Sequence, residues 1–232
     1  MQQTTIRYGL TVAAILATAT FVNAHGDVAP QAVDTTGLPE SGDEWLAENP
    51  YRAETAGEEV WLKALEIGAS GYNQNCARCH GLEVVSGGLA PDLRLLQAAD
   101  YDDEWYVERY RHGFTQNGIT KMPAFGDLLG QDAGWAIRTY IETRPDDEVM
   151  GQFVGELAAM RDQMEMYAKD ASGADLDALK ARLAEIAAEI PTISGAPVAD
   201  SVAFRAANLI DGTPAAYAAA AETLTIGLSA AQ

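Results

Sequence analysis

The stretch Cys76-Ala77-Arg78-Cys79-His80 contains both cysteines of the chain, in the pattern C-x-x-C-H. Two thiols at this spacing reach both vinyl groups along one edge of a haem, and the histidine that follows is then held beneath the iron. The pattern is a signal for covalent attachment of c-type haem. We therefore predict one covalent haem c, bound through Cys76 and Cys79, with His80 as the proximal iron ligand.

Two other kinds of site use a pair of nearby cysteines. A thioredoxin-like redox pair needs a strand–helix–strand setting, whereas the sequence around residues 76–80 predicts only helices and loops. A structural zinc site needs four ligands, and His112 would have to be the fourth. Its spacing from the motif fits no common zinc finger, so haem attachment is the favoured interpretation.

Met122 is the candidate for the sixth ligand of the iron. It lies 42 positions after His80, in a stretch without helical periodicity, and Pro123 stiffens the chain behind it. A thioether ligand stabilises ferrous iron and raises the reduction potential. His112 is the rival ligand and would give a lower potential. The later methionines lie on helical stretches and are typical of core filling.

Three further residues are expected to shape the site. A backbone carbonyl near Pro91 could accept the free ring N–H of His80, which would orient the ring and raise its basicity. Tyr72 and Trp135 are expected in the wall of the haem pocket. Tyr72 shares a predicted helix with Gly68, whose missing side chain would allow the Trp135 helix to cross closely.

Hydrophobic spacing predicts an all-α fold with no clear strand. In the middle of the chain we expect helices over 58–75, from Asp102 or Asp103 to His112, and over 131–143, separated by loops 81–96 and 114–130. Beyond Glu148 the composition shifts to Ala, Glu, Asp and Leu, and three or four further helices are expected. This extension either docks a partner or packs on its own neighbours, and the second interpretation is favoured because most amphipathic helices bury their apolar stripe within their own fold.

The N-terminus has the features of a secretory signal peptide. Arg7 precedes a short apolar stretch that ends in Val22-Asn23-Ala24, a small-residue cleavage pattern. No later segment is long and apolar enough to span a bilayer. We predict cleavage after Ala24 and a periplasmic location. Residues 1–24 are thus the signal peptide, 25–57 an arm, 58–147 the haem domain and 148–232 the helical extension.

The charge of the chain is strongly negative. Lys and Arg total 15 against 34 Asp and Glu, a formal net charge of −19. Such a surface repels nucleic acids and anionic membranes. It favours a partner with a basic docking patch, unless the charge serves only to keep an exported protein in solution.

From Leu65 to Arg144, about a third of the chain, the sequence resembles class I cytochrome c. The resemblance lies in the order of Gly68 and Tyr72, the C-x-x-C-H motif, Pro91-Asp92-Leu93, Met122-Pro123 and the helix with Trp135. It implies covalent haem c, His80 and Met122 as iron ligands, and one-electron transfer.

A narrower resemblance points to a partner. Residues 43–45, 49–52, 72–82 and 87–94 are similar to the soluble cytochromes that accept electrons from pyrroloquinoline quinone (PQQ) alcohol dehydrogenases. The similarity to these shorter cytochromes ends after Pro145.

The expected function is therefore a periplasmic electron carrier and not an enzyme. It would accept electrons from a PQQ-dependent alcohol dehydrogenase and pass them toward a terminal oxidase. One alternative is a haem enzyme with an open iron position for peroxide or a gas, in which His112 or Arg111 serves the distal side. Another is a cytochrome subunit of a larger respiratory complex, docked through the helical extension.

Overall fold

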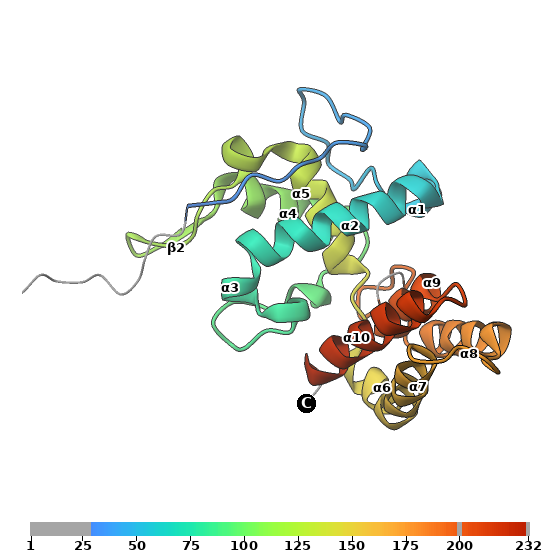
Figure 1. The fold of residues 1–232 in the computed structure, drawn as a ribbon. Helices are drawn as coiled ribbons and strands as arrows, with labels where there is room; N and C mark the ends of the chain where they lie inside the picture. The colour runs from blue at the N-terminus through green and yellow to red at the C-terminus, as the bar shows by residue number, and fades with distance from the viewer. Residues whose placement is uncertain (1–28, 199–200, 231–232) are drawn as a thin grey trace, which may run out of the picture.

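The computed structural model describes residues 29–198 and 201–230. The predicted signal peptide and its cleavage site after Ala24 lie outside these residues. The described chain forms two groups of helices, seen at the upper left and lower right of Figure 1. No helix among the described residues is long and apolar enough to cross a membrane.

The first group contains the predicted haem motif and a small hairpin. Its elements are α1 (Ala53–Ala56), α2 (Glu58–Asn75), α3 (Ala77–His80), η1 (Leu82–Val84), η2 (Leu93–Leu95), α4 (Asp100–His112), β1 (Phe114–Gln116), β2 (Ile119–Met122) and α5 (Gly126–Glu142). These helices enclose the N-terminal core, which we define by the buried residues Tyr51, Ala64, Ile67, Tyr72, Ala77, Val84, Leu93, Tyr106, Val107, Tyr110, Phe125, Trp135, Ala136, Ile137, Tyr140 and Ile141.

The crossing of α2 and α5 is built on one glycine. A Cβ atom on Gly68 would lie 1.9 Å from the carbonyl oxygen of Ala136 and 3.0 Å from the Cβ of Tyr140. Only glycine allows the two backbones to approach this closely. The rings of Tyr72 and Tyr140 meet beside the crossing, with centroids 5.4 Å apart. The predicted crossing of these two helices is confirmed.

Two helices begin earlier than the sequence predicts. α4 starts at Asp100, so Asp102 and Asp103 lie in its first turn rather than at the cap, a place where the helix dipole also favours carboxylates. α5 starts at Gly126 rather than near residue 131, with a break at Gly130, whose φ is +79°. Gly113 ends α4 as predicted.

The expectation of no strand was wrong for the loop after α4. β1 and β2 pair antiparallel, with Thr115 opposite Thr120. The turn between them consists of Asn117 and Gly118, with φ angles of +53° and +74°. An Asn-Gly pair with two positive φ angles is the preferred two-residue hairpin turn. The signal was present in the sequence, but strands this short give too few residues for alternation to show.

The N-terminal arm is held to the first group by two aromatic residues, Trp45 and Tyr51. The Tyr51 hydroxyl donates to the carbonyl oxygen of Pro39 at 2.8 Å and contacts Asp132 Oδ1 at 3.0 Å. The ring of Trp45 packs on Tyr110, with centroids 6.1 Å apart. These contacts fix the arm across α4 and α5.

The second group has a core of its own. It comprises α6 (Asp147–Gly151), α7 (Val154–Tyr167), α8 (Leu176–Glu189), α9 (Val202–Leu209) and α10 (Pro214–Ala230). The apolar stripe of α8, with Leu179, Leu183 and Ile186, is buried against its neighbours within this group. Thus the stripe packs inside the extension, as the favoured interpretation expected.

A short segment between α8 and α9 joins the two groups. Asp146 N–H donates to the carbonyl of Pro191 at 2.8 Å, and Ala98 N–H donates to that of Ser194 at 3.0 Å. The buried hydroxyl of Ser194 also donates to the carbonyl oxygen of Glu142. The extension therefore rests on the end of α5 and on the loop before α4.

Candidate functional site

The C-x-x-C-H motif forms a single helical turn directly after α2. Cys76 is half-buried against the N-terminal core, Cys79 is exposed and His80 is half-buried. Gly81 ends the turn with a φ of +88°, and a Cβ there would lie 1.8 Å from the carbonyl oxygen of Val85. The hydroxyl of Tyr72 donates to the carbonyl of Gly81 at 2.8 Å. The turn is thus held in place by α2.

The predicted bond between His80 and the Pro91 segment is present. Nδ1 of His80 lies 2.9 Å from the carbonyl oxygen of Pro91. A carbonyl can only accept, so Nδ1 is the protonated nitrogen and Nε2 carries the free lone pair. This is the tautomer that an iron ligand needs.

Arg94 holds the turn that carries Pro91. Its guanidinium donates to Asp92 Oδ1 at 3.0 Å and Oδ2 at 2.7 Å, and to Asp147 at 2.8 Å. Burial alone would raise the pKa of Asp92, but the hydrogen bonds from Arg94 outweigh it and hold the pKa below its ordinary value. The turn beside His80 is therefore fixed by ionised groups.

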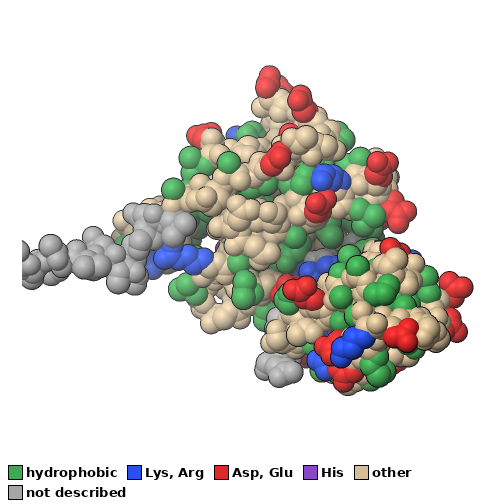
Figure 2. Space-filling view, in the orientation of Figure 1, with side chains coloured by type: hydrophobic (Ala, Val, Ile, Leu, Met, Phe, Trp, Pro, Cys, Tyr) green, Lys and Arg blue, Asp and Glu red, His purple; other side chains and the backbone are tan. Residues whose placement is uncertain are grey.

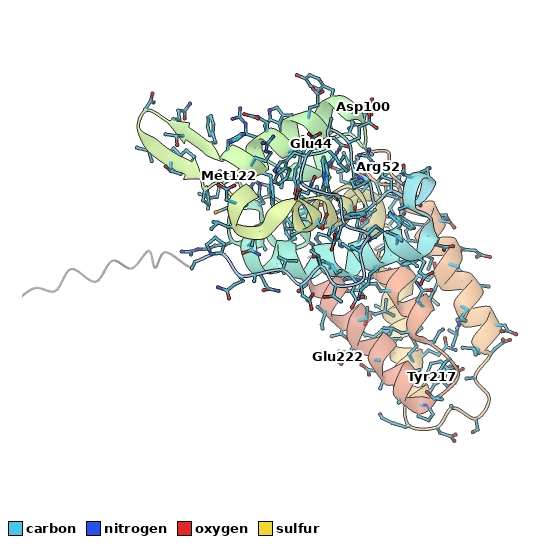
Figure 3. All side chains as sticks on the ribbon, turned by 90° about the horizontal axis from the view of Figure 1, so that it is seen from above. Glu44, Arg52, Asp100, Met122, Tyr217 and Glu222 are labelled. Atoms are coloured by element: carbon cyan, nitrogen blue, oxygen red, sulfur yellow. The ribbon has the colours of Figure 1, made fainter. Side chains whose placement is uncertain are left out.

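Met122 lies at the end of β2, at the base of the hairpin (Figure 3). It is half-buried and packs against the same N-terminal core as Cys76. Its backbone passes close to Gly113, where a Cβ would lie 2.4 Å from the Met122 carbonyl oxygen. Phe125 N–H donates to the carbonyl of Tyr110 at 2.8 Å, which ties the other end of the loop to α4. The fold therefore brings the predicted sixth ligand and the motif to one core.

Aromatic side chains fill the core between the motif turn and the loop that carries Met122. Trp135 is buried at 1% exposure beside Tyr106, with ring centroids 6.2 Å apart. Among the described residues, no hydrogen-bond partner faces the buried indole N–H of Trp135. Buried indole N–H groups usually find an acceptor. A haem in the pocket carries carboxylates that could accept this bond, so the orphaned donor fits the group.

The two cysteines differ in their surroundings. Burial raises the pKa of the Cys76 thiol to about 12, and the neighbouring Cys79 adds to the effect. Cys76 is therefore neutral and shielded, while Cys79 is open to solvent. A pair of thiols with one half-buried and one exposed member suits a haem edge that enters the core on one side.

The residues proposed for a distal enzymatic role point elsewhere. Nε2 of His112 lies 3.7 Å from the carboxylate of Glu108 on the exposed face of α4. The guanidinium of Arg111 stacks over Trp45 of the arm, 5.0 Å from the ring centroid. Within the described part of the chain, no group of three or more His, Cys, Asp and Glu side chains is arranged to hold a metal ion.

A buried network of ion pairs joins the arm, α4 and α5, and was not predicted from the sequence. Arg138 and Asp103 are fully buried and paired at 2.9 Å, and Arg52 of the arm reaches Asp103 and Glu142 at 2.8 Å. The amide of Asn49 donates to Glu142 at 3.1 Å. A signal was available in the sequence, since Arg138 and Glu142 lie one turn apart in a helix with many apolar residues.

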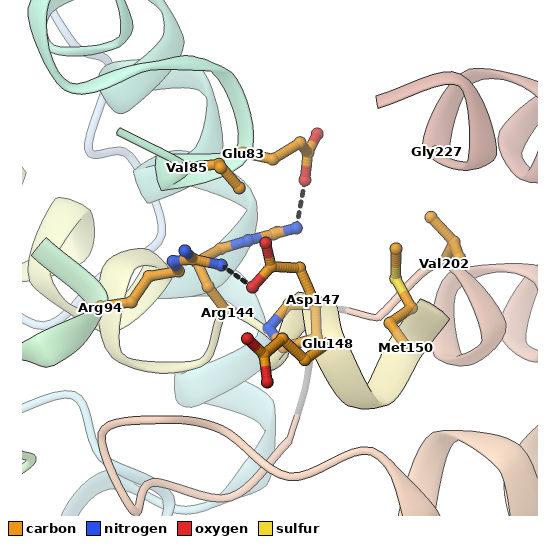
Figure 4. A pocket seen from close by; sticks show the side chains of 10 residues that line it. Glu83, Val85, Arg94, Arg144, Asp147, Glu148, Met150, Val202 and Gly227 are labelled. Carbon is orange, nitrogen blue, oxygen red and sulfur yellow. Dashed lines mark hydrogen bonds and ion pairs between the residues drawn. The ribbon is translucent and has the colours of Figure 1, made fainter. Parts of the chain in front are cut away.

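A cavity of about 350 Å³ lies between the loop after His80 and the second group of helices (Figure 4). Arg144 forms an ion pair with Glu83 on one side of it, and Arg94 pairs with Asp147 on the other. Val202 of α9 closes the cavity on the far side. None of the predicted haem-binding residues lines it, so the cavity belongs to the junction of the two groups.

Comparison with known proteins identifies the family. The chain is 50% identical to cytochrome c550 of Pseudomonas aeruginosa over 148 residues, which is 64% of this chain and the whole length of that relative. The chain belongs to the class I c-type cytochromes. This cytochrome therefore carries covalently bound haem c and is an electron-transfer protein.

Other matches are shorter. Residues 63–141 of the cytochrome match the family model described as cytochrome c oxidase, cbb3-type, subunit III. Two quinohemoprotein alcohol dehydrogenases of Pseudomonas putida, ADH IIB and ADH-IIG, are each 32% identical, over 88 and 84 residues. These matches cover 38% and 36% of the cytochrome but only 12% and 11% of each dehydrogenase. No solved structure matches the chain.

Proposed function

We propose that this cytochrome accepts electrons from a PQQ-dependent alcohol dehydrogenase in the periplasm and passes them toward a terminal oxidase. Its similarity to parts of two quinohemoprotein alcohol dehydrogenases supports this donor. The signal-like sequence that ends at Ala24 supports the location, because c-type haem is attached outside the cytoplasm. Mass spectrometry of the purified protein should find His25 as its first residue.

The residues proposed to hold the haem are Cys76 and Cys79 through thioethers, and His80 and Met122 as axial ligands. The observation that carries this proposal is the hydrogen bond from His80 Nδ1 to the Pro91 carbonyl, at 2.9 Å. It leaves Nε2 as the basic nitrogen and fixes the ring in one orientation. When bound, haem c supplies an iron that gains and loses one electron.

The chain contributes rigidity and exclusion of water. Tyr72 holds the motif turn through the carbonyl of Gly81. Burial raises the pKa of Tyr72 far above its ordinary value, so its hydroxyl stays a donor at any physiological pH. Trp135 and its aromatic neighbours keep water from the buried side of the pocket. A site that changes little between two oxidation states is suited to transfer of single electrons.

The test is reduction of the purified ferric cytochrome by a quinoprotein alcohol dehydrogenase supplied with ethanol, followed by visible absorbance. Rapid reduction that needs both ethanol and active dehydrogenase is expected. If the dehydrogenase leaves the haem ferric while dithionite reduces it fully, the proposed donor is wrong. The haem and the carrier function would stand in that case, and another donor would have to be sought.

A further inference from the structure

Carboxylates are missing from the two segments that carry the predicted haem ligands Cys76, Cys79, His80 and Met122. Residues 67–82 and 109–126 contain no Asp or Glu, although the chain has 34 of them among 232 residues. At that frequency, 34 residues would hold about five. The same two segments contain Arg78, Arg109 and Lys121 among their basic residues. The chain as a whole has a net charge of −19, whereas these two segments carry no negative side chain.

The fold brings these two segments to one end of the molecule. The second half of α2, α3 and the hairpin lie together at the left of Figure 1, away from the C-terminal helices. Met122 and Cys76 pack against the same core there. In Figure 2, a blue group lies near this end and no red group lies beside it, whereas red groups are spread over the top, right and lower parts of the molecule, together with further blue ones.

The exposed side chains of the two segments are apolar, basic or polar without charge. We define the haem-end surface by Arg78, Leu82, Leu89, Ile119 and Lys121. Leu82, Leu89 and Ile119 are 71%, 77% and 58% exposed, and Arg78 and Lys121 are exposed as well. Large exposed apolar side chains grouped with charges of one sign are typical of a surface that binds another protein.

Two more cations of the second segment are held in place by aromatic rings. The guanidinium of Arg109 stacks on Phe114 of the hairpin at 5.0 Å, and that of Arg111 stacks on Trp45 at 5.0 Å. Within residues 29–198 and 201–230, neither of them forms an ion pair with a carboxylate.

Two carboxylates close in sequence to this surface, Glu83 and Asp92, have cationic partners. Glu83, which follows Leu82, pairs with Arg144 and lies 3.8 Å from Arg205 of α9. Asp92 pairs with Arg94 at 2.7 Å. These two carboxylates therefore add little net negative charge beside the haem-end surface, whereas Asp127, which follows the second segment, is exposed.

We propose that the haem-end surface docks a protein whose own patch is apolar with an acidic rim. This inference rests on the carrier function proposed above and specifies the chemistry of the partner. It reverses the expectation drawn from net charge, which favoured a basic patch on the partner. An acidic partner repels the acidic remainder of the cytochrome and attracts the basic side chains of the haem-end surface. This uneven charge orients the cytochrome with its haem-end surface toward the partner as the two proteins approach.

The local charge can be measured with small oxidants of opposite sign. The ferrous holoprotein is oxidised in a stopped-flow instrument by hexacyanoferrate(III), an anion, and by tris(phenanthroline)cobalt(III), a cation, over a range of salt concentrations. We expect the rate with the anion to fall as salt increases, because salt screens an attraction. The rate with the cation should rise or stay level.

Two matched charge reversals test whether the oxidation rate depends on charge at the haem-end surface. Lys121→Glu is expected to slow the reaction with hexacyanoferrate(III) about 3- to 10-fold at low salt, since it replaces an attraction by a repulsion near the site. Lys169→Glu makes the same change of charge after α7 in the second group of helices, where Lys169 is exposed, and should change the rate much less. Polyglutamate, an acidic macromolecular probe, should slow the reaction of the wild type and not that of Lys121→Glu.

Two results would overturn the proposal. In one, the anion reacts faster as salt increases, as the net charge alone would dictate. In the other, Lys169→Glu has as large an effect as Lys121→Glu. Both results leave the carrier function intact, because electrons still exchange rapidly. Slow exchange with both oxidants at every salt concentration would instead contradict the carrier function, and with it this surface.

Discussion

The ring of His80 and the carbonyl of Pro91 are joined by a hydrogen bond of 2.9 Å, although 11 residues separate them in the chain. The bond depends on the turn that follows Pro91. Arg94 fixes this turn by pairing with Asp92 and, from the start of α6, with Asp147. The orientation of the predicted iron ligand is therefore linked through Arg94 to the junction with the C-terminal helices.

Replacing Arg94 is expected to change the reduction potential. In Arg94→Gln the turn loses its ion pairs, the bond from His80 to Pro91 weakens, and the imidazole becomes a poorer donor to ferric iron. The potential of the holoprotein should rise. Arg161→Gln is the control, because it breaks an exposed pair with Asp162 on α7. Redox titration checks both variants, and equal potentials in wild type and Arg94→Gln would disprove the link.

Replacing Met122 tests the sixth ligand. Met122→Ala should lose the long-wavelength absorption of a ferric haem with a thioether ligand, and its ferrous form should bind carbon monoxide, which the wild type resists. Met166→Ala is the matched control, since Met166 lies on α7 and is 61% exposed. If Met122→Ala keeps the wild-type spectrum, another group binds the iron.

The crossing of α2 and α5 predicts an effect on stability. Gly68→Ala places a methyl group against the Ala136 carbonyl and should cost about 1–3 kcal/mol or more of the free energy of unfolding. Gly155→Ala on α7 meets nothing within 4 Å and should gain up to about 1 kcal/mol, because alanine favours the helix. Denaturation by urea measures both. Similar stabilities for the two variants would mean that the helices do not cross at Gly68.

The buried carboxylate of Glu142 predicts a dependence on pH. Burial raises its pKa, and the bonds and charges of Arg52 and Arg138 offset only part of this. A carboxyl group with a raised pKa stabilises the fold most at a pH below its unfolded value, and this contribution declines as pH rises through the folded value. The wild type should therefore lose stability relative to Glu142→Gln as pH increases from about 4, near the ordinary pKa of Glu, toward neutrality. Urea denaturation at several pH values tests the sign, and a relative gain with pH would contradict it.

Removal of the C-terminal helices tests the independence of the two cores. A chain that ends at Gly151 keeps every residue of the N-terminal core but loses the bonds that Pro191 and Ser194 make to the first group. We expect it to keep its haem and visible spectrum, with the unfolding free energy lowered by a few times the ~1 kcal/mol of a typical hydrogen bond. Ser194→Ala in the full chain measures one of these bonds separately. Failure of the shortened chain to retain haem would show that the extension is part of the haem domain.

The helices and the candidate ligands could be predicted from the sequence because their signals are local. Apolar residues at helical spacing predict α2 and α8. Gly113 predicts the end of α4, because glycine readily adopts the positive φ found there. Cys76, Cys79 and His80 form a chemical pattern within five residues. Their roles as haem ligands, and that of Met122, remain predictions. The hairpin at Asn117-Gly118 had a local signal too, but its strands are too short to be recognised by alternation.

Other features depend on contacts between distant residues, and only the tertiary structure decides them. The pairing of Arg52 with Asp103 and Glu142 joins the arm, α4 and α5, and no local pattern predicts which buried charges meet. Likewise, composition predicts a net charge but not its distribution over the surface. The fold alone places two carboxylate-free segments at the same end, because proximity in space depends on how helices cross and not on the order of residues.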